Sequence, residues 1–162
     1  ELKNSEKDLA EHLMIVDLLR NDLGKICKFD SINVLDLFNV ESYKTIHHMV
    51  TKISGTLNNN TKFSNIIRAL FPGGSITGAP KERAIEIIDL IEKNPRNIYT
   101  GSIGHVINNQ RMNFNIAIRT LTINKGIGSY HVGGGIVWDS DPLLEWEEAN
   151  TKSNILNGII NK

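Results

Sequence analysis

The chain has 162 residues, of which 40% are hydrophobic and 22% are charged, and its 18 Lys and Arg residues balance 18 Asp and Glu residues. This composition is typical of a globular domain, and the neutral balance excludes a general attraction to nucleic acid or to membrane surfaces. No apolar run approaches the roughly 18 residues of a membrane span. The single cysteine, Cys27, excludes an internal disulfide and predicts a reducing compartment, the cytoplasm.

The first predicted element is a helix from Glu6 to Asp22, which we expect to end at Gly24 in a left-handed conformation. Asp8 and Glu11 lie three residues apart, so their carboxylates share one side of this helix. That side continues with three apolar residues, Ile15, Leu18 and Leu19. The pattern predicts carboxylates that face the interior. A solvated acidic first turn, favoured by the helix dipole, is the alternative.

Two strands are expected next, from Ser31 to Val40 and from Tyr43 to Gly55. The second strand contains the adjacent histidines His47 and His48, which would point to opposite faces. Only one of them can therefore face a shared site. Each taken alone is more often a packed or surface histidine than a catalyst. A helix from Lys62 to Leu70 follows a polar turn.

The segment from Phe71 to Arg83 (FPGGSITGAPKER) is rich in glycine and proline and precedes a predicted helix from Lys81 to Glu92. Its backbone amides and the hydroxyls of Ser75 and Thr77 lie close to a helix N-terminus, a combination that attracts anions. The segment lacks the GKS or GKT ending of a nucleotide-binding P-loop. A purely structural turn is the alternative.

The hydrophobic pattern changes to a period of two after Tyr99. Three strands are predicted, from Tyr99 to Ile107, from Met112 to Ile123 and from Ile127 to Val137. Residues 108–110 and 124–126 suit hairpin connections, so the strands should form an antiparallel meander.

Arg119 falls deep in the second of these predicted strands, among apolar residues. A buried guanidinium needs an anionic partner, and either a carboxylate of a ligand or a carboxylate of the protein would serve.

A glycine triplet, Gly133, Gly134 and Gly135, interrupts the end of the third predicted strand. Glycines there indicate a bulge or a close approach to the backbone, and their exposed amides could bind a carboxylate.

The last helix is predicted to start at Ser140-Asp141-Pro142 and to carry Glu145, Glu148 and Lys152 on one side. The two glutamates form a second carboxylate pair at the spacing of Asp8 and Glu11. Four carboxylates in one place need a cation, and Mg²⁺ is the hard ion suited to carboxylate and water ligands. An ordinary glutamate and lysine pair on a wet surface is the alternative.

Four segments together resemble the chorismate-utilising enzymes. They are AEHLMIVDLLRNDLGKIC (Ala10 to Cys27), FPGGSITGAPKERAIEIID (Phe71 to Asp89), IAIRT (Ile116 to Thr120) and GGGIVWDSDPLLEWEE (Gly133 to Glu148). Within the family, the second and fourth segments are most similar to the component I subunits of aminodeoxychorismate synthase. The resemblance implies an α+β fold of antiparallel sheets flanked by helices. We expect residues 1–162 to be the C-terminal part of a single chorismate-binding domain, without its N-terminal part.

The resemblance also implies a set of site residues. Mg²⁺ would be held by Glu11 and Glu148, with Asp8 and Glu145 one turn earlier acting through water, although the family often has glutamate in place of Asp8. The implied catalytic residues are His48, near the departing group of the ring, and Ser75, the loop hydroxyl. The residues implied in substrate binding are Tyr99, Arg119, Gly133 and Gly135, together with the recurring basic residue Lys152.

The activity implied is the Mg²⁺-dependent amination of chorismate to 4-amino-4-deoxychorismate for folate synthesis. Ammonia would come from a glutamine amidotransferase subunit, and no nucleic acid or membrane partner is expected. The PIKG-like lysine motif of these synthases does not occur in this chain, and Lys81 belongs to the separate GAPK motif. Anthranilate synthase component I and a non-catalytic fragment are the alternatives.

Overall fold

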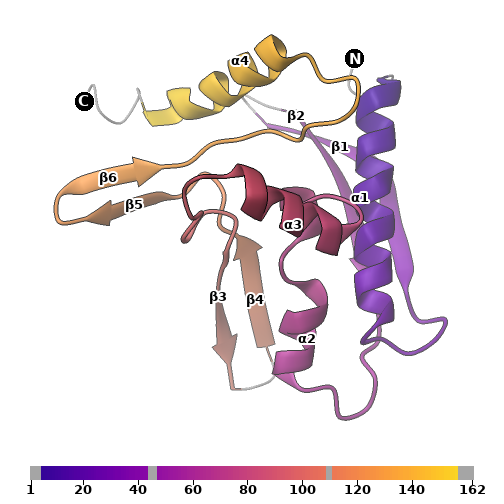
Figure 1. Ribbon diagram of the computed structural model, residues 1–162. Helices are drawn as coiled ribbons and strands as arrows, with labels where there is room; N and C mark the ends of the chain where they lie inside the picture. Colours follow the sequence, from indigo (N-terminus) through magenta and orange to yellow (C-terminus); the bar gives the residue numbers. More distant parts are fainter. Residues whose placement is uncertain (1–4, 44–46, 109–110, 157–162) are drawn as a thin grey trace. The chain divides into compact units, whose positions relative to one another are not determined.

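The computed structural model describes residues 5–43, 47–108 and 111–156 (Figure 1). The chain divides into two compact units, Glu1–Ile91 and Glu92–Lys162. Both units combine helices with antiparallel strand pairs, so the α+β class is confirmed. The assignment of the whole chain to one domain stays a prediction. No helix in the described part of the chain is long and apolar enough to cross a membrane.

The first unit begins with the helix α1 (Glu6–Gly24). Ser5 caps it, because its hydroxyl oxygen accepts a hydrogen bond from the Asp8 amide at 3.3 Å. The predicted left-handed end at Gly24 is wrong. Gly24 belongs to the helix, and Lys25 follows with a right-handed φ of −71°, its amide bonded to the carbonyls of Asp22 and Leu23. The helix therefore ends at the predicted residue, but without the left-handed conformation.

One side of α1 faces the interior, as the sequence predicted. Asp8, Glu11, Ile15 and Leu18 are half-buried, and Asp22 at the end of the same side is fully buried. These residues recur every three or four positions, which is the spacing of one helical face. The carboxylates on this side of α1 therefore do not extend freely into solvent.

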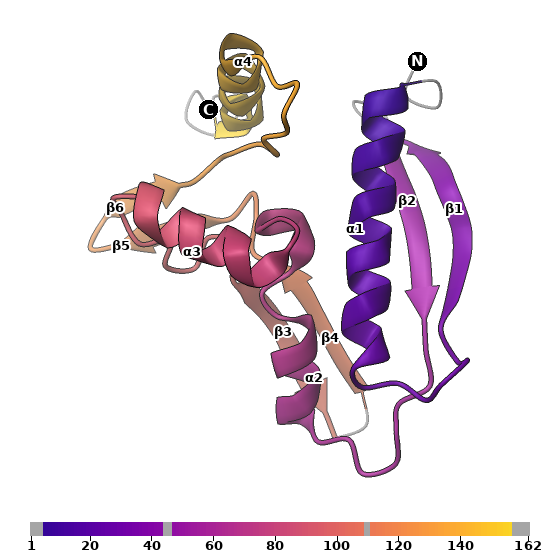
Figure 2. The ribbon, with the colours of Figure 1, turned by 45° about the vertical axis from the view of Figure 1, so that its right-hand side comes forward.

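Helix α1 packs on a hairpin of β1 (Asn33–Ser42) and β2 (His47–Ser54), as Figure 2 shows. The pairing is antiparallel and its register shifts between Leu35 and Asn39, where β1 bulges. His12 fastens the helix to the hairpin, with Nε2 at 2.7 Å from the Thr51 hydroxyl. Burial lowers the pKa of His12, because removal from water disfavours the charged ring.

The remaining elements of this unit are α2 (Phe63–Leu70), the short 3-10 helix η2 (Gly74–Ile76) and α3 (Lys81–Ile91). The core cluster lies between the end of α1 and α2. Its buried members are Ile26, Cys27 and Ala69, packed against Leu23, Ile32, Ile66 and Leu70. Cys27 is a small packing residue of this cluster, and burial raises the pKa of its thiol.

The second unit contains two strand pairs, followed by α4 (Pro142–Ser153) and η3 (Asn154–Leu156). The pairs are β3 (Ser102–Ile107) with β4 (Arg111–Ile116), and β5 (Leu121–Asn124) with β6 (Ile127–Tyr130). Both pairs are hairpins, as predicted. Among the described residues they form two separate sheets, so the predicted continuous meander is wrong.

The meander breaks because the second predicted strand is interrupted at residues 117–120. Arg119 adopts a left-handed conformation with φ of 50°, and the Ile118 amide bonds back to the Ile116 carbonyl. A strand cannot continue through such a turn. By contrast, Lys125 and Gly126 both have positive φ and form a tight two-residue turn within the hairpin connection predicted for residues 124–126.

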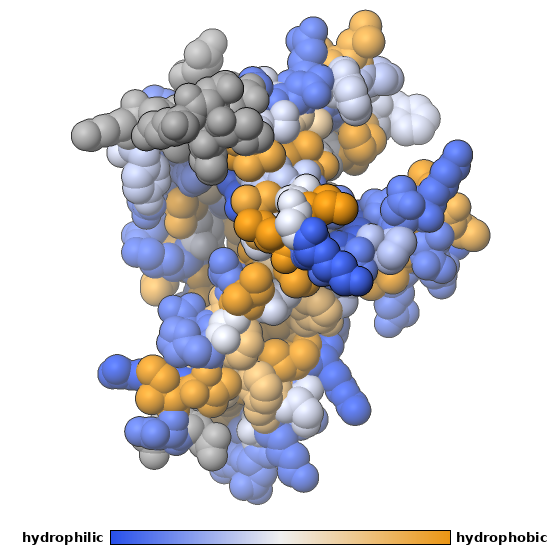
Figure 3. Space-filling view, turned by 90° about the vertical axis from the view of Figure 1, so that its left-hand side faces the viewer, coloured by the Kyte–Doolittle hydropathy of each residue, from blue (hydrophilic) through white to orange (hydrophobic). Residues whose placement is uncertain are grey.

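Many apolar side chains remain at the surface of the described chain (Figure 3). Examples are Trp138, at 99% exposure, and Leu90 on α3, at 79%. The apolar spacing of α3 therefore predicted the helix correctly, but most of the large apolar side chains of this helix are exposed.

Candidate functional site

In the first unit, α1 supports the other elements that carry predicted site residues. The helix contacts β2, which holds His48, and η2, which holds Ser75. Asp8 and Glu11 lie one turn apart near its N-terminal end and are half-buried. Half-burial argues against a fully solvated acidic turn, because an unneutralised carboxylate is costly to remove from water.

The two histidines lie in different surroundings on β2. His47 contacts the Ser42 hydroxyl through Nδ1 at 2.9 Å, and both side chains are exposed. His48 is exposed as well and meets the Tyr43 ring edge-on, with ring centroids 5.8 Å apart. The Tyr43 hydroxyl donates to Glu41 at 2.7 Å, and this bond together with the charge of Glu41 raises the pKa of Tyr43. His48 is thus available to a ligand, beside a neutral tyrosine ring.

The glycine and proline loop before α3 is closed by its own hydrogen bonds. The amides of Ile76, Thr77 and Gly78 donate to the carbonyls of Gly73 and Gly74. The Thr77 hydroxyl also donates to the Gly73 carbonyl, at 3.0 Å. These groups hold the turn. Ser75 is exposed, so its hydroxyl is the loop group best placed to meet a ligand.

Gly74 brings this loop directly against α1. It is buried, and a methyl group built on it would overlap Cδ2 of Leu18 and lie 2.8 Å from its Cγ. Only a residue without a side chain fits between the loop and the helix at this point. The glycine is therefore required for the position of η2 on α1.

Replacing Gly74 by alanine is expected to destabilise the fold by about 1–3 kcal/mol, because the added methyl group overpacks against Leu18. Urea unfolding measures the loss. In a Leu18→Ala background the nearest remaining atom is Cβ at 3.6 Å, so the same change should cost about 0.5 kcal/mol or less there. Equal costs in the two backgrounds would contradict this packing.

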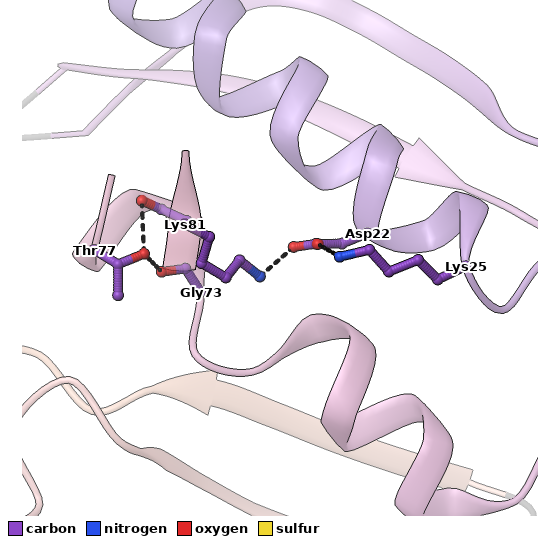
Figure 4. Close-up of polar contacts among 6 residues, drawn as sticks. Asp22, Lys25, Gly73, Thr77 and Lys81 are labelled. Atoms are coloured by element: carbon purple, nitrogen blue, oxygen red, sulfur yellow. Dashed lines mark hydrogen bonds and ion pairs between the residues drawn. The ribbon is translucent and has the colours of Figure 1, made fainter. Parts of the chain in front are cut away.

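An ion-pair cluster that the sequence analysis did not single out joins the end of α1 to the start of α3. Asp22 is fully buried and accepts hydrogen bonds from Lys25, at 2.9 Å, and from Lys81 (Figure 4). The available signal was that Asp22 continues the side of α1 that bears Asp8 and Glu11. A buried carboxylate needs such partners, so the pairs of Asp22 hold the end of α1 and the start of α3 together.

In the second unit, Tyr99 is held between two side chains. Its ring stacks on His131, with centroids 5.5 Å apart and planes 20° apart, and the Arg96 guanidinium lies 5.9 Å from its centroid. Gly133 lies beside the Tyr99 hydroxyl, which would be 2.9 Å from an added Cβ. The structure thus brings together two residues predicted to bind substrate, Tyr99 and Gly133.

Gly134 lies against α4, where Asp141 caps the helix. An added Cβ on Gly134 would lie 2.9 Å from Oε2 of Glu145 and 3.8 Å from Oε1 of Glu148. Lys152 donates to the Gly133 carbonyl at 3.1 Å and to Glu148. The carboxylate pair, Lys152, Gly133 and Gly134 therefore form one cluster, of which the sequence predicted only the carboxylates and the lysine as neighbours.

Ser140 orients the outer carboxylate of this cluster. Its hydroxyl donates to Oε1 of Glu145 at 2.6 Å and accepts from the Val137 amide at 3.0 Å. Such a bonded serine fixes the direction of the carboxylate before any ligand binds.

Arg119 differs from its predicted environment. Its side chain is exposed instead of buried, and among the described residues it forms no ion pair with a protein carboxylate. The expectation of a buried arginine is wrong because β4 ends before this residue. The Thr100 amide bonds to the Ala117 carbonyl at 3.0 Å, which brings Tyr99 and Arg119 to the same end of the β3–β4 hairpin. An exposed guanidinium at this end suits a ligand carboxylate.

The four acidic residues are divided between the two units, with Asp8 and Glu11 in one and Glu145 and Glu148 in the other. Within the described residues, no group of three or more His, Cys, Asp or Glu side chains is suited to hold a metal ion. Each unit by itself therefore supplies one pair of carboxylates. The assignment of these residues to a metal site stays a prediction.

Comparison with known proteins identifies one family and several relatives that match nearly the whole chain. Residues 1–158 match the family described as chorismate binding enzyme. The chain is 49% identical over 160 residues to a probable chloroplastic aminodeoxychorismate synthase of Oryza sativa subsp. japonica, covering 99% of the chain and 18% of that protein. It is 48% identical over 154 residues to aminodeoxychorismate synthase component 1 of Escherichia coli (strain K12), and the match covers 95% of this chain and 34% of that protein. The chain is 44% identical over 160 residues to anthranilate synthase component 1 of Saccharolobus solfataricus, and the match covers 99% of this chain and 38% of that protein.

Solved structures show the same relationship. Anthranilate synthase component I from Streptococcus pneumoniae TIGR4 matches with a TM-score of 0.89 and 35% identity, over 94% of this chain and 35% of that one. The menaquinone-specific isochorismate synthase MenF from Escherichia coli matches with a TM-score of 0.85 and 25% identity, over 95% of this chain and 35% of that one. The chain thus spans well under half the length of these relatives. It belongs to the chorismate-binding enzyme family.

Proposed function

We propose that this chain is part of the catalytic subunit of an aminodeoxychorismate synthase. Such an enzyme aminates chorismate to 4-amino-4-deoxychorismate, the precursor of para-aminobenzoate and folate. The observation that supports it best is the identity of 47–49% to aminodeoxychorismate synthases of plants and bacteria over nearly the whole chain. A glutamine amidotransferase subunit would supply the ammonia. The cytoplasm stays our predicted compartment, although the rice and Arabidopsis thaliana relatives are described as chloroplastic.

The acidic residues fit Mg²⁺ by their chemistry. Carboxylates and water are its usual ligands, and one or two carboxylates suffice when a substrate anion and waters complete the shell. The absent side chain of Gly134 leaves room beside the carboxylate oxygens of Glu145 and Glu148. We expect Glu11 and Glu148 to hold the ion directly, and Asp8 and Glu145 to act through water. Bound there, Mg²⁺ would neutralise and orient a substrate carboxylate.

The second unit offers donors for the remaining carboxylate of chorismate. Arg119 presents an exposed guanidinium, which binds carboxylates in a planar, two-bonded arrangement. The amides of Gly133 and Gly135 and the hydroxyl of Tyr99 would complete this contact. Lys152 would hold the glycine backbone in place, because it already bonds to the Gly133 carbonyl.

His48 is the residue proposed to act on the departing group. Amination replaces the ring hydroxyl, which leaves as water only if it receives a proton. An exposed imidazole beside Tyr43 can donate that proton from its cationic form. Ser75, on the loop that packs against α1, would bind the substrate by its hydroxyl.

Arg119→Ala is expected to weaken chorismate binding. Charge-assisted hydrogen bonds contribute about 1.5–3 kcal/mol, so the KM for chorismate should rise about 10- to 100-fold. Because the side chain is exposed, the free energy of unfolding should change by about 0.5 kcal/mol or less. Steady-state kinetics and urea unfolding measure the two effects. Arg111→Ala, an exposed arginine at the start of β4, is the control. A loss of stability without a change in KM would show a structural role instead.

Product analysis tests the proposed reaction. The protein expressed from its complete reading frame is incubated with chorismate, Mg²⁺ and ammonium, and the products are separated by chromatography. We expect 4-amino-4-deoxychorismate. Anthranilate would instead support the second candidate, anthranilate synthase component I, which the 44% identity to the Saccharolobus solfataricus protein favours. The absence of both products would contradict the proposal.

A further inference from the structure

The buried ion-pair cluster of Asp22, Lys25 and Lys81 has no role in the function proposed above. Asp22 has the largest fully buried side chain among the described residues. Lys25 and Lys81 approach its two carboxylate oxygens from different elements (Figure 4). A buried carboxylate is retained in a fold only where its partners are well placed, because its desolvation is costly.

The two lysines differ in what they connect. Lys25 lies three residues beyond Asp22, and its side chain is 56% exposed. Lys81 is 59 residues away in the sequence, is 13% exposed and is the first residue of α3. The Lys25 pair is therefore local and solvated. The Lys81 pair is shielded from water and ties a separate element to α1, so its electrostatic attraction is the less screened of the two.

The Lys81 pair also fixes one end of the loop that carries Ser75. At the other end, Gly74 packs against Leu18 without room for a side chain. Leu18 and Asp22 lie one turn apart on the side of α1 that begins with Glu11. The loop is thus attached at two points to the helix whose carboxylates are proposed to hold Mg²⁺.

We propose that Lys81 is a positioning residue for chorismate. Its ion pair with Asp22 holds residues 73–81 at a set place along α1, and so sets the distance between the Ser75 hydroxyl and the carboxylate of Glu11. This inference rests on the proposed function. A shift of about 1 Å in a substrate-positioning group can cost about 100-fold in rate, so a buried attachment at this point would have a kinetic effect beyond its contribution to stability.

Lys81→Met and Lys25→Met form a matched pair for the test. Both remove one ammonium group from the same carboxylate, but only Lys81 is attached to the loop. In the protein expressed from its complete reading frame, Lys81→Met should lower kcat/KM for chorismate about 10- to 100-fold. Lys25→Met should leave kcat/KM within about twofold. Lys81→Arg, which keeps the charge, should recover most of the loss.

Hydrogen exchange of the loop amides gives a second readout that does not depend on turnover. The amides of Ile76, Thr77 and Gly78 are bonded within the loop and should exchange slowly. At a temperature where all variants are folded, exchange at residues 73–80 should become at least about tenfold faster in Lys81→Met and stay unchanged in Lys25→Met. If Lys81→Met does not fold, Asp22→Asn, which has the same shape, is measured with the same expectations.

The outcomes separate the two proposals. A wild-type protein that does not convert chorismate refutes the proposed function, and the exchange rates still decide whether Lys81 holds the loop. Normal turnover in Lys81→Met together with a lower melting temperature shows a structural role alone and overturns the positioning role. Equal kinetic losses in Lys81→Met and Lys25→Met also overturn it, because they would follow from the charge of Asp22 and not from the loop.

Discussion

His48→Asn is expected to reduce the kcat for chorismate amination about 10²- to 10⁴-fold, the range associated with loss of a general acid. Asparagine keeps a polar side chain of similar reach but cannot deliver a proton to the departing oxygen. Because His48 is exposed on β2, the substitution should leave the fold intact. Single-turnover rates with saturating chorismate and ammonium measure the chemical step directly.

His47→Asn is the control for this experiment. His47 is the adjacent residue on the same strand, is equally exposed, and contacts the Ser42 hydroxyl. Successive residues of a strand face opposite ways, so His47 should not reach a ligand bound on the side of His48. We expect a kcat within about twofold of wild type. Similar losses in both variants, or none in His48→Asn, would remove His48 from the mechanism.

Glu148→Gln is expected to reduce Mg²⁺-dependent kcat/KM about 10²- to 10³-fold, the cost of removing one electrostatic contact that stabilises the transition state. Glutamine has the shape of glutamate but lacks the charge that a divalent cation requires. Lys152, which pairs with Glu148, would also lose its anionic partner. Initial rates over a range of Mg²⁺ concentrations should show both the lower maximum and a higher concentration for half-activation.

Glu147→Gln provides the matched comparison for Glu148→Gln. Glu147 lies one position earlier on α4 and is exposed, so the same change in charge is made on the same helix on a different side. Its kinetics and metal dependence should remain those of the wild type. Unchanged metal dependence in Glu148→Gln would refute the assignment of this residue to the metal site.

The structure gives the glycine segment beside α4 a steric role. Gly133 faces the Tyr99 hydroxyl, and Gly134 faces the carboxylates of Glu145 and Glu148. A side chain at either position would occupy space next to a polar group that is proposed to bind a ligand. The glycines therefore allow these polar groups to lie close to the backbone, as the sequence indicated.

Several local features were predictable from the sequence because short-range chemistry determines them. Asp141 and Pro142 start α4 as expected, since the aspartate side chain accepts bonds from the first free amides of the helix. Lys125 and Gly126 form the predicted tight turn, because glycine tolerates a positive φ. Hydrophobic periodicity located α1, α2 and α3 to within two residues.

Other expectations failed where a local signal was ambiguous. Large apolar residues alternate from Met112 to Ile118 and again from Leu121 to Ile123, but in the opposite phase. The chain turns between these two stretches at Arg119, which takes a left-handed conformation that arginine rarely adopts. The burial of Arg119 was inferred from its apolar neighbours and is wrong for the same reason. Helix α1 does end at Gly24, as expected, but the left-handed conformation expected there is not adopted, and Lys25 follows with a right-handed φ.

The sequence by itself determined the family, the helices and turns, and the spacing of the two carboxylate pairs. These follow from contacts between residues close in the chain and from motifs that occur in a set order. Only the tertiary structure decided that Asp22 is buried and paired with Lys81, and that Gly74 lies against Leu18. Residues 59 positions apart leave no periodic signal in the sequence. Their partnership exists only because packing α1 against the loop removes the carboxylate from water and makes a buried cation necessary.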